Sequence, residues 1–178
     1  IHLGATSNDI VDSAVALQIK DSIKIQVEAL SNLTLTLCDM AERERNTVMI
    51  GRTHGQAAVP ITFGLKVAVW VDEMRRHLER LKELTPRVTT GKFLGAVGTG
   101  AAQGENAFQL QELIMENLGL QTPMATTQVV GRDRYIEWVG WMANLATSIE
   151  KILQEIRNLQ RSEIAEVAEY FDVEKQVG

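Results

Sequence analysis

Residues 131–160 read GRDRYIEWVGWMANLATSIEKILQEIRNLQ, and this stretch decides the fold class. Its apolar side chains recur at alternating steps of four and three residues: Trp138, Met142, Leu145, Ile149, Ile152, Ile156 and Leu159. That spacing marks one face of an α-helix, and its strict alternation is a heptad repeat, typical of helices that pack nearly parallel to one another. The pattern predicts a long helix over about residues 132–171, packed against other helices.

Two segments nearer the N-terminus also carry helical patterns. The first is predicted over residues 9–45, where apolar residues again recur at steps of three and four. Ser7 suits the position before a helix, and Asp9 and Asp12 suit its first turn, where acidic residues favour the helix dipole. The second is predicted to begin at Pro60, because proline fits the first turn of a helix. Pro86 is expected to bend or end this second helix, because a proline inside a helix removes a backbone hydrogen bond.

A glycine-rich connection over residues 91–104 precedes a shorter helix, predicted over residues 105–118 with Gly119 just past its end. The connection lacks the Gly-Lys-Ser/Thr ending of a nucleotide-binding loop, so we expect a tight, buried crossover instead. No stretch reads as a convincing strand. The sequence therefore predicts an all-α fold, an elongated bundle of long helices whose apolar stripes need partners from other subunits.

Composition narrows the class of protein. The chain has 178 residues, of which 45% are apolar, and a formal net charge of −5, so a single domain with a sizeable core is expected and a basic nucleic-acid-binding face is not. No apolar run reaches about 18 residues, which argues against a membrane span. The single cysteine, Cys38, is predicted to be a small core residue, and its lack of a disulfide partner fits the cytoplasm.

A histidine, His54, stands in the segment Gly51-Arg52-Thr53-His54-Gly55-Gln56, just ahead of Pro60. We expect His54 to lie near a helix entry, where backbone N–H groups favour anions. Because an imidazole gains or loses a proton near neutral pH, this placement predicts proton chemistry on an anionic substrate. The alternative is a turn in which the histidine is only a capping residue.

Two polar clusters are candidate binding sites. Thr6 and Ser7 open the first helix, and their hydroxyl groups together with free backbone amides form a possible anion cradle or an ordinary helix cap. Gln128 precedes the longest helix and offers both donors and an acceptor to a polar ligand. Arg132 and Arg134 follow it, and structural ion pairing, with Asp133 or with a neighbouring helix, is the favoured interpretation over ligand binding.

A metal site is not predicted. Glu73 and His77 are four residues apart, which is not the Glu-x-x-His spacing of di-iron bundles, and no second such pair occurs. By the composition of its neighbours, His77 is expected on a solvated face.

Six motifs in register resemble the fumarase/aspartase superfamily and, within it, most resemble the adenylosuccinate lyase family. They are GATSNDI at 4–10, GRTHGQ at 51–56, FG at 63–64, GAVGT at 95–99, TQVV with RDRY at 127–135, and EIRNLQR at 155–161. Gly55 and the Thr-Gln-Val-Val element favour this family over the argininosuccinate and fumarate enzymes. A relative of the 3-carboxymuconate cycloisomerases remains an alternative.

The resemblance implies an enzyme that eliminates fumarate by breaking a carbon–nitrogen bond, with no cofactor and no metal. It implies that His54 is the general acid, that Thr53 holds a substrate carboxylate or phosphate beside it, that Thr6 and Ser7 bind the succinyl carboxylates, and that Gln128 binds polar groups of the substrate. It also implies a homotetramer in which each active site takes residues from different subunits.

The resemblance further implies that residues 1–178 are the central helical domain alone. The N-terminal domain, the mobile loop that carries the serine base, and the C-terminal domain are then absent, with Gln176-Val177-Gly178 as the lead-in to that loop. We therefore expect the chain by itself to be inactive. Two non-enzymatic alternatives stay open: a catalytically silent structural member of the superfamily, and a plain helical oligomerisation bundle.

Overall fold

The structure of the chain is a computed structural model that describes residues 2–172 and 174–175. The segment 176–178, predicted to lead into a mobile loop, lies outside the described residues. The chain divides into two compact units, residues 1–35 with 74–142 and residues 36–73 with 143–178, which we call the first unit and the second unit.

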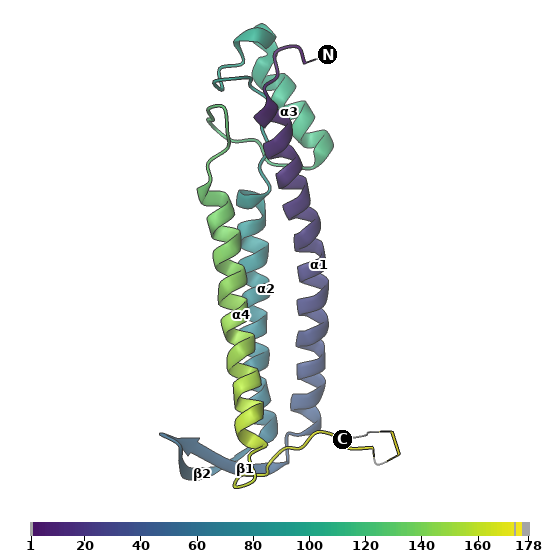
Figure 1. The fold of residues 1–178 in the computed structure, drawn as a ribbon, viewed down its shortest axis with the longest axis vertical. Helices are drawn as coiled ribbons and strands as arrows, with labels where there is room; N and C mark the ends of the chain where they lie inside the picture. The colour runs from purple at the N-terminus through teal and green to yellow at the C-terminus, as the bar shows by residue number, and fades with distance from the viewer. Residues whose placement is uncertain (1, 173, 176–178) are drawn as a thin grey trace. The chain divides into compact units, whose positions relative to one another are not determined.

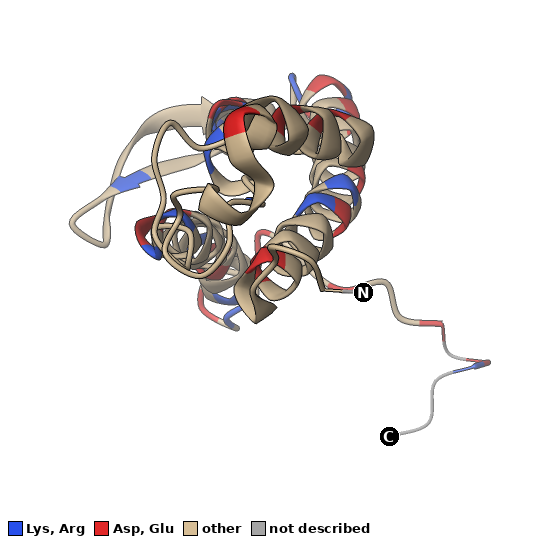
Figure 2. Cartoon of the chain, turned by 90° about the horizontal axis from the view of Figure 1, so that it is seen from above, with Lys and Arg blue, Asp and Glu red and all other residues tan. Residues whose placement is uncertain are grey.

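The predicted all-α class is confirmed, with one addition. The described residues contain four α-helices, α1 (Ser7–Arg43), α2 (Phe63–Val88), α3 (Ala107–Leu118) and α4 (Asp133–Leu159), and a 3-10 segment, η1 (Ala101–Asn106) (Figure 1). They also contain an antiparallel hairpin of β1 (Val48–Thr53) and β2 (Gln56–Thr62). Acidic and basic residues both occur along the helices, in keeping with the modest net charge (Figure 2).

The hairpin corrects the predicted start of the second helix. Pro60 lies in β2 opposite Ile50, and α2 begins only at Phe63. Both strands of a two-stranded sheet are edge strands, which accept proline because its missing N–H group need not join the ladder. At the other end, α2 continues through Pro86 and stops at Val88, so the predicted termination is right to within two residues.

The predicted extension of the last helix to residue 171 is wrong, because α4 ends at Leu159. Beyond it the chain folds back: the N–H group of Glu166 donates to the carbonyl oxygen of Leu159 at 3.0 Å, and Ala165 takes a left-handed conformation with φ of 49°. Apolar periodicity predicts which residues can be helical, but it does not register a tertiary contact that ends a helix.

The core of the first unit packs α1 against α3. Ala16, Met115 and Leu120 are buried together, with Phe93 from the glycine-rich connection against them. Gly119 has φ of 61° at the end of α3, as predicted, and α3 spans nearly the predicted range.

His77 corrects a second prediction, because it is only 1% exposed rather than solvated. Its carbonyl oxygen accepts a hydrogen bond from Trp141 Nε1 at 3.1 Å, and the two rings meet edge to face. This contact joins α2 to α4 within the first unit.

In the second unit, α2 packs against both other long helices. Gly64 lies so close to α1 that a Cβ atom there would stand 2.5 Å from the carbonyl oxygen of Ala41. On α4, Ile152 is buried while Ile149 is half-buried, so the heptad face is only partly covered within the chain. Cys38 is exposed, which overturns its predicted place in the core.

Candidate functional site

The first helix begins with a reciprocal cap. The N–H group of Thr6 donates to Asp9 Oδ2 at 2.8 Å, and the N–H group of Asp9 donates to the carbonyl oxygen of Thr6 at 3.0 Å. Asp9 thus takes the part that Glu or Gln plays in a capping box. The cap fixes Thr6, which is buried, directly before Ser7, which is exposed at the N-terminal end of α1. The first N–H groups of a helix lack intrahelical acceptors, so this end suits an anion.

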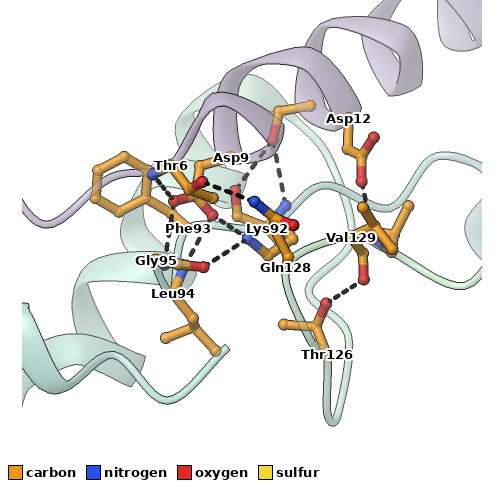
Figure 3. Close-up of polar contacts among 12 residues, drawn as sticks. Thr6, Asp9, Asp12, Lys92, Phe93, Leu94, Gly95, Thr126, Gln128 and Val129 are labelled. Carbon is orange, nitrogen blue, oxygen red and sulfur yellow. Dashed lines mark hydrogen bonds and ion pairs between the residues drawn. The ribbon is translucent and has the colours of Figure 1, made fainter. Parts of the chain in front are cut away.

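Asp9 also holds the glycine-rich connection (Figure 3). Its carboxylate accepts hydrogen bonds from the N–H groups of Leu94 at 3.2 Å and Gly95 at 3.1 Å, and it forms an ion pair with Lys92. Both charged side chains are completely buried, and Lys92 Nζ also donates to the carbonyl oxygen of Gly95 at 3.3 Å. Because the two charges compensate each other, the carboxylate of Asp9 does not oppose an anion at the start of α1.

Asp12, one turn further along α1, holds the segment that leads into α4. Its Oδ2 accepts the N–H group of Val130 at 2.8 Å, and its Oδ1 accepts Arg132 Nη1 at 2.9 Å. The Asp12 carboxylate raises the pKa of the Arg132 guanidinium, while burial is the main cause that raises the pKa of the neighbouring Tyr135 phenol. The favoured interpretation of Arg132, pairing with a neighbouring helix, is confirmed.

Thr6 and Gln128, which stand 122 residues apart in the sequence, meet between these contacts. Gln128 Nε2 donates to Thr6 Oγ1 over a long 3.4 Å. The loop that carries Gln128 is braced by Thr126, whose Oγ1 donates to the carbonyl oxygen of Val129 at 2.8 Å. Gly98 backs onto this loop, and a Cβ atom there would stand 2.1 Å from the carbonyl oxygen of Thr126.

Three segments therefore converge in the first unit, residues 4–9, 92–98 and 126–130, and we call them the three-loop cluster (Figure 3). The exposed hydroxyl of Ser7 and the exposed amide of Gln128 offer neutral donors beside the hydroxyl of Thr6. Neutral donors at a helix N-terminus bind a carboxylate or a phosphate, but they do not transfer a proton at neutral pH. The chemistry of this cluster suits the binding of an anion rather than proton transfer.

The predicted proton-transfer residue lies in the second unit, on the turn of the hairpin. His54 and Gly55 form the two-residue loop, with φ of 55° and 70°, and the flanking Thr53 and Gln56 pair across it. Both φ values are positive, as in the type I′ turns that join antiparallel strands. The expectation that His54 lies at a helix entry is therefore wrong, and both Thr53 and His54 are exposed.

The conformation of His54 is itself informative. A left-handed backbone costs a non-glycine residue about 1–2 kcal/mol, and Asn or Gly is the usual choice in such a turn. Strained residues of this kind cluster at functional sites, where the side chain has a purpose. The alternative, a turn with a capping histidine, is right about the turn, but no helix terminus lies at this position for His54 to cap, because it stands between β1 and β2.

A bidentate ion pair ties the hairpin to the chain beyond α4. Arg52 Nη1 and Nη2 donate to the two carboxylate oxygens of Glu166 at 2.7 and 3.0 Å. The hydrogen bonds from Arg52 hold the pKa of the Glu166 carboxyl below its usual value. A cavity of about 590 Å³ lies beside this pair, lined among others by Trp70, Ile156 and Glu166.

The predicted site residues thus fall into two sets. Thr6, Ser7 and Gln128 belong to the first unit, where the structure brings Thr6 and Gln128 together, and Thr53 and His54 belong to the second unit. Within residues 2–172 and 174–175, no three His, Cys, Asp or Glu side chains are grouped to hold a metal ion. No helix in the same part of the chain combines the length and hydropathy that a bilayer span requires.

Comparison with known proteins identifies the family of the chain that carries these two sets of residues. A protein-family model described as "Lyase" matches residues 1–178. The chain belongs to this lyase family. The match confirms the resemblance that the six sequence motifs predict, and the motifs of the three-loop cluster and of the hairpin are part of it.

Individual relatives agree with the family assignment. The adenylosuccinate lyase of Pyrococcus horikoshii is 53% identical over 178 residues, which are 100% of this chain and 39% of that protein. A fumarate lyase from Mesorhizobium sp. BNC1 has a similar structure, with a TM-score of 0.89 and 38% identity over 94% of this chain and 40% of that chain. A 3-carboxy-cis,cis-muconate lactonizing enzyme from Pseudomonas putida gives a TM-score of 0.86 and 35% identity over 92% and 37%. The chain therefore spans about two fifths of the length of the relatives it matches.

Sequence reasoning did not identify the buried charges behind the site. Asp9 and Asp12 read as ordinary acidic residues in the first turns of a helix, where they favour the helix dipole. A signal was present, because Thr6-x-x-Asp9 has the spacing of a capping box and Lys92 stands alone among glycine and apolar residues. The long-range partners of the two carboxylates, in contrast, leave no mark in local sequence.

Proposed function

We propose that this chain is the central helical domain of an adenylosuccinate lyase, which releases fumarate from adenylosuccinate and from SAICAR in purine nucleotide biosynthesis and leaves AMP and AICAR. The single observation that carries this proposal is the 53% identity to a curated adenylosuccinate lyase along the whole chain. Identity to the muconate lactonizing enzyme is 35%, so a cycloisomerase or another lyase of the family is the second candidate.

The reaction is a β-elimination. A base removes a proton from the carbon next to a carboxylate, the electron pair of that C–H bond forms the double bond of fumarate, and the electron pair of the C–N bond passes to the leaving nitrogen. The nitrogen then takes a proton from an acid. Negative charge that develops on the carboxylate during the first step needs donors aimed at it. No step requires a cofactor or a metal.

Of the base, the donors to the carboxylate and the acid, we assign the donors and the acid to the described residues. We assign Thr6, Ser7 and Gln128 to the succinyl carboxylates and polar groups, because their neutral donors stand beside the N-terminal end of α1 and the nearby buried charges are compensated. We assign the proton donation to His54, with Thr53 holding an anionic group beside it. An anion there favours the cationic imidazole that the acid step needs.

The exposed placement of His54 supports an assembly of several copies of the chain. His54 is exposed on a hairpin turn, so the described residues of one chain do not enclose a substrate beside it. Acid catalysis needs a proton donor that is held against its substrate. We therefore propose a homotetramer in which subunits share active sites, with α4 packed in the central seam through the partly covered heptad face. We also place the enzyme in the cytoplasm, a reducing compartment that suits the free thiol of Cys38.

The test uses the full-length enzyme and two substitutions at the hairpin turn. His54→Asn and His54→Gly both accept the left-handed backbone, and neither donates a proton near neutral pH. We expect both variants to keep the wild-type melting temperature and assembly, and to lose about 10²–10⁴ in turnover of adenylosuccinate, followed by absorbance. Argininosuccinate and 3-carboxymuconate are assayed in parallel to separate the second candidate function.

Three outcomes would contradict parts of the proposal. Wild-type turnover of 3-carboxymuconate but not of adenylosuccinate would replace the substrate. Near-normal turnover of His54→Asn across the pH range would remove His54 from the acid step. A well-folded wild-type protein with no turnover of any of the three substrates would favour a structural helical bundle.

A further inference from the structure

The loop that carries Gln128 depends on one buried carboxylate. Gln128 is exposed, and its amide reaches Thr6 only through a 3.4 Å hydrogen bond, which is too long to fix the loop by itself. The loop is braced internally by Thr126 against Val129. The next backbone N–H group, that of Val130, donates to Asp12 Oδ2 at 2.8 Å, and Val130 is 1% exposed. The hydrogen bond from the Val130 N–H group to Asp12 therefore holds the loop that carries Gln128.

Asp12 is placed to hold that point rigidly. It is 1% exposed, it projects from the second turn of α1, and its other oxygen accepts Arg132 Nη1 at 2.9 Å. Two charge-assisted contacts on successive parts of one segment fix both its position and its direction. Because Thr6 stands directly before the first residue of α1, the start of this one helix places both the hydroxyl group and the carboxylate that positions its partner amide (Figure 3).

We propose that Asp12 is a positioning residue for substrate binding: by holding the Val130 N–H group and Arg132, it keeps the amide of Gln128 within reach of a carboxylate bound at Thr6. The proposal rests on the assignment of Gln128 to substrate binding under the proposed function. It differs from a purely structural role, in which the loss of Asp12 would weaken the fold without acting through Gln128.

The experiment is a double-mutant cycle in the full-length enzyme, with Asp12→Ala, Gln128→Ala and the double variant. Two readouts are taken: KM and kcat for adenylosuccinate, and the dissociation constant of fumarate alone by titration calorimetry. We expect each single variant to raise KM and the fumarate dissociation constant about tenfold, the size of one lost hydrogen bond, with kcat changed by less than about threefold. If Asp12 acts through Gln128, the double variant binds no more weakly than Gln128→Ala alone.

A matched control separates this effect from a loss of stability. Glu137 accepts Arg87 Nε at 2.9 Å and joins α4 to α2 in the same unit. Glu137→Gln weakens this charge-assisted pair, which is more exposed than Asp12, and we expect it to lower the melting temperature slightly without changing KM. Asp12→Asn keeps an acceptor for the Val130 N–H group, so it should recover part of the lost affinity.

The outcomes distinguish the two proposals. Effects of Asp12→Ala and Gln128→Ala that multiply in the double variant, or a KM change in Glu137→Gln as large as that in Asp12→Ala, would overturn the positioning role while the proposed function stands. A wild-type enzyme that neither cleaves adenylosuccinate nor binds fumarate would overturn both. Non-additive effects on fumarate binding support the positioning role even if turnover proves to be of another dicarboxylate substrate.

Discussion

The buried ion pair of Asp9 and Lys92 makes a quantitative prediction about stability. The carboxylate of Asp9 receives the N–H groups of Thr6, Leu94 and Gly95 as well as the ammonium of Lys92. Asp9→Ala removes all four contacts and leaves a completely buried ammonium group with one carbonyl acceptor, that of Gly95. Breaking a buried pair by removal of one partner costs about 3–5 kcal/mol, and we expect a loss of that size or larger.

The orphaned charge, rather than the lost hydrogen bonds, should dominate this loss. An unsatisfied buried N–H group costs about 1–3 kcal/mol and can be relieved by a small movement of the loop, whereas a buried ammonium cannot. Lys92→Met therefore has opposite effects in two backgrounds. In the wild type it removes the counter-charge of Asp9 and destabilises the protein. In Asp9→Ala it removes the orphaned charge, so the double variant should be more stable than Asp9→Ala alone.

Urea unfolding followed by circular dichroism at 222 nm checks these signs, at one protein concentration because assembly also shifts the midpoint. A loss of about 3–5 kcal/mol is large against a total stability of about 5–15 kcal/mol. The reasoning is refuted if Lys92→Met destabilises both backgrounds by the same amount. That result would mean that the pair contributes by packing rather than by compensating buried charge.

Three further predictions concern the second unit, the seam and the chain by itself. Because Arg52 lowers the pKa of Glu166, the carboxylate stabilises the fold fully above the ordinary pKa of glutamate, and this stabilisation is lost as the pH falls through the lowered value; Glu166→Gln should thus lower the melting temperature at pH 7 and make little difference once the pH is below the lowered pKa. Ile149→Asp places an unpaired charge in the proposed seam, and sedimentation velocity should show smaller assemblies than the wild type at equal concentration. Purified residues 1–178 should fold into helices, by circular dichroism, yet show no turnover of adenylosuccinate; activity in this preparation after removal of contaminating lyase would show that the base lies within the chain.

The spacing of apolar residues predicted most of the fold, because a helix leaves a regular pattern in its own stretch of sequence. The heptad from Trp138 to Leu159 coincides with α4, and Gly119 ends α3 as predicted. The two errors at helix boundaries have one cause: a nonlocal contact overrode a local pattern. Arg52 pairs with Glu166 where the last helix was expected to continue, and the ladder of β1 and β2 takes up Pro60, which by itself suits a helix start equally well.

For the candidate site, the sequence predicted some of the residues but not the structure around them. Thr6 and Gln128 were singled out as polar groups ahead of predicted helices, and the resemblance gave them roles; the structure brings them together although they are 122 residues apart. The hairpin around His54 was missed, because a His-Gly turn is a weaker signal than Asn-Gly and the strands that flank it are short. The carboxylates of Asp9 and Asp12 were recognised only as helix-start residues, since nothing in local sequence names the partner of a buried charge.

The charges of the first unit give a reason why the proposed function assigns binding and proton transfer to separate residues. Asp9 and Asp12 would repel a dicarboxylate at the start of α1 if they stood alone, and Lys92 and Arg132 compensate them. What remains beside the proposed substrate is a set of neutral donors, which hold an anion without exchanging a proton with it and hold it more tightly as its negative charge grows. Proton transfer needs a group that changes charge, and the proposed function assigns it to His54 on the hairpin. In the proposed homotetramer, a site shared between subunits would combine the neutral donors of one copy with the imidazole of another.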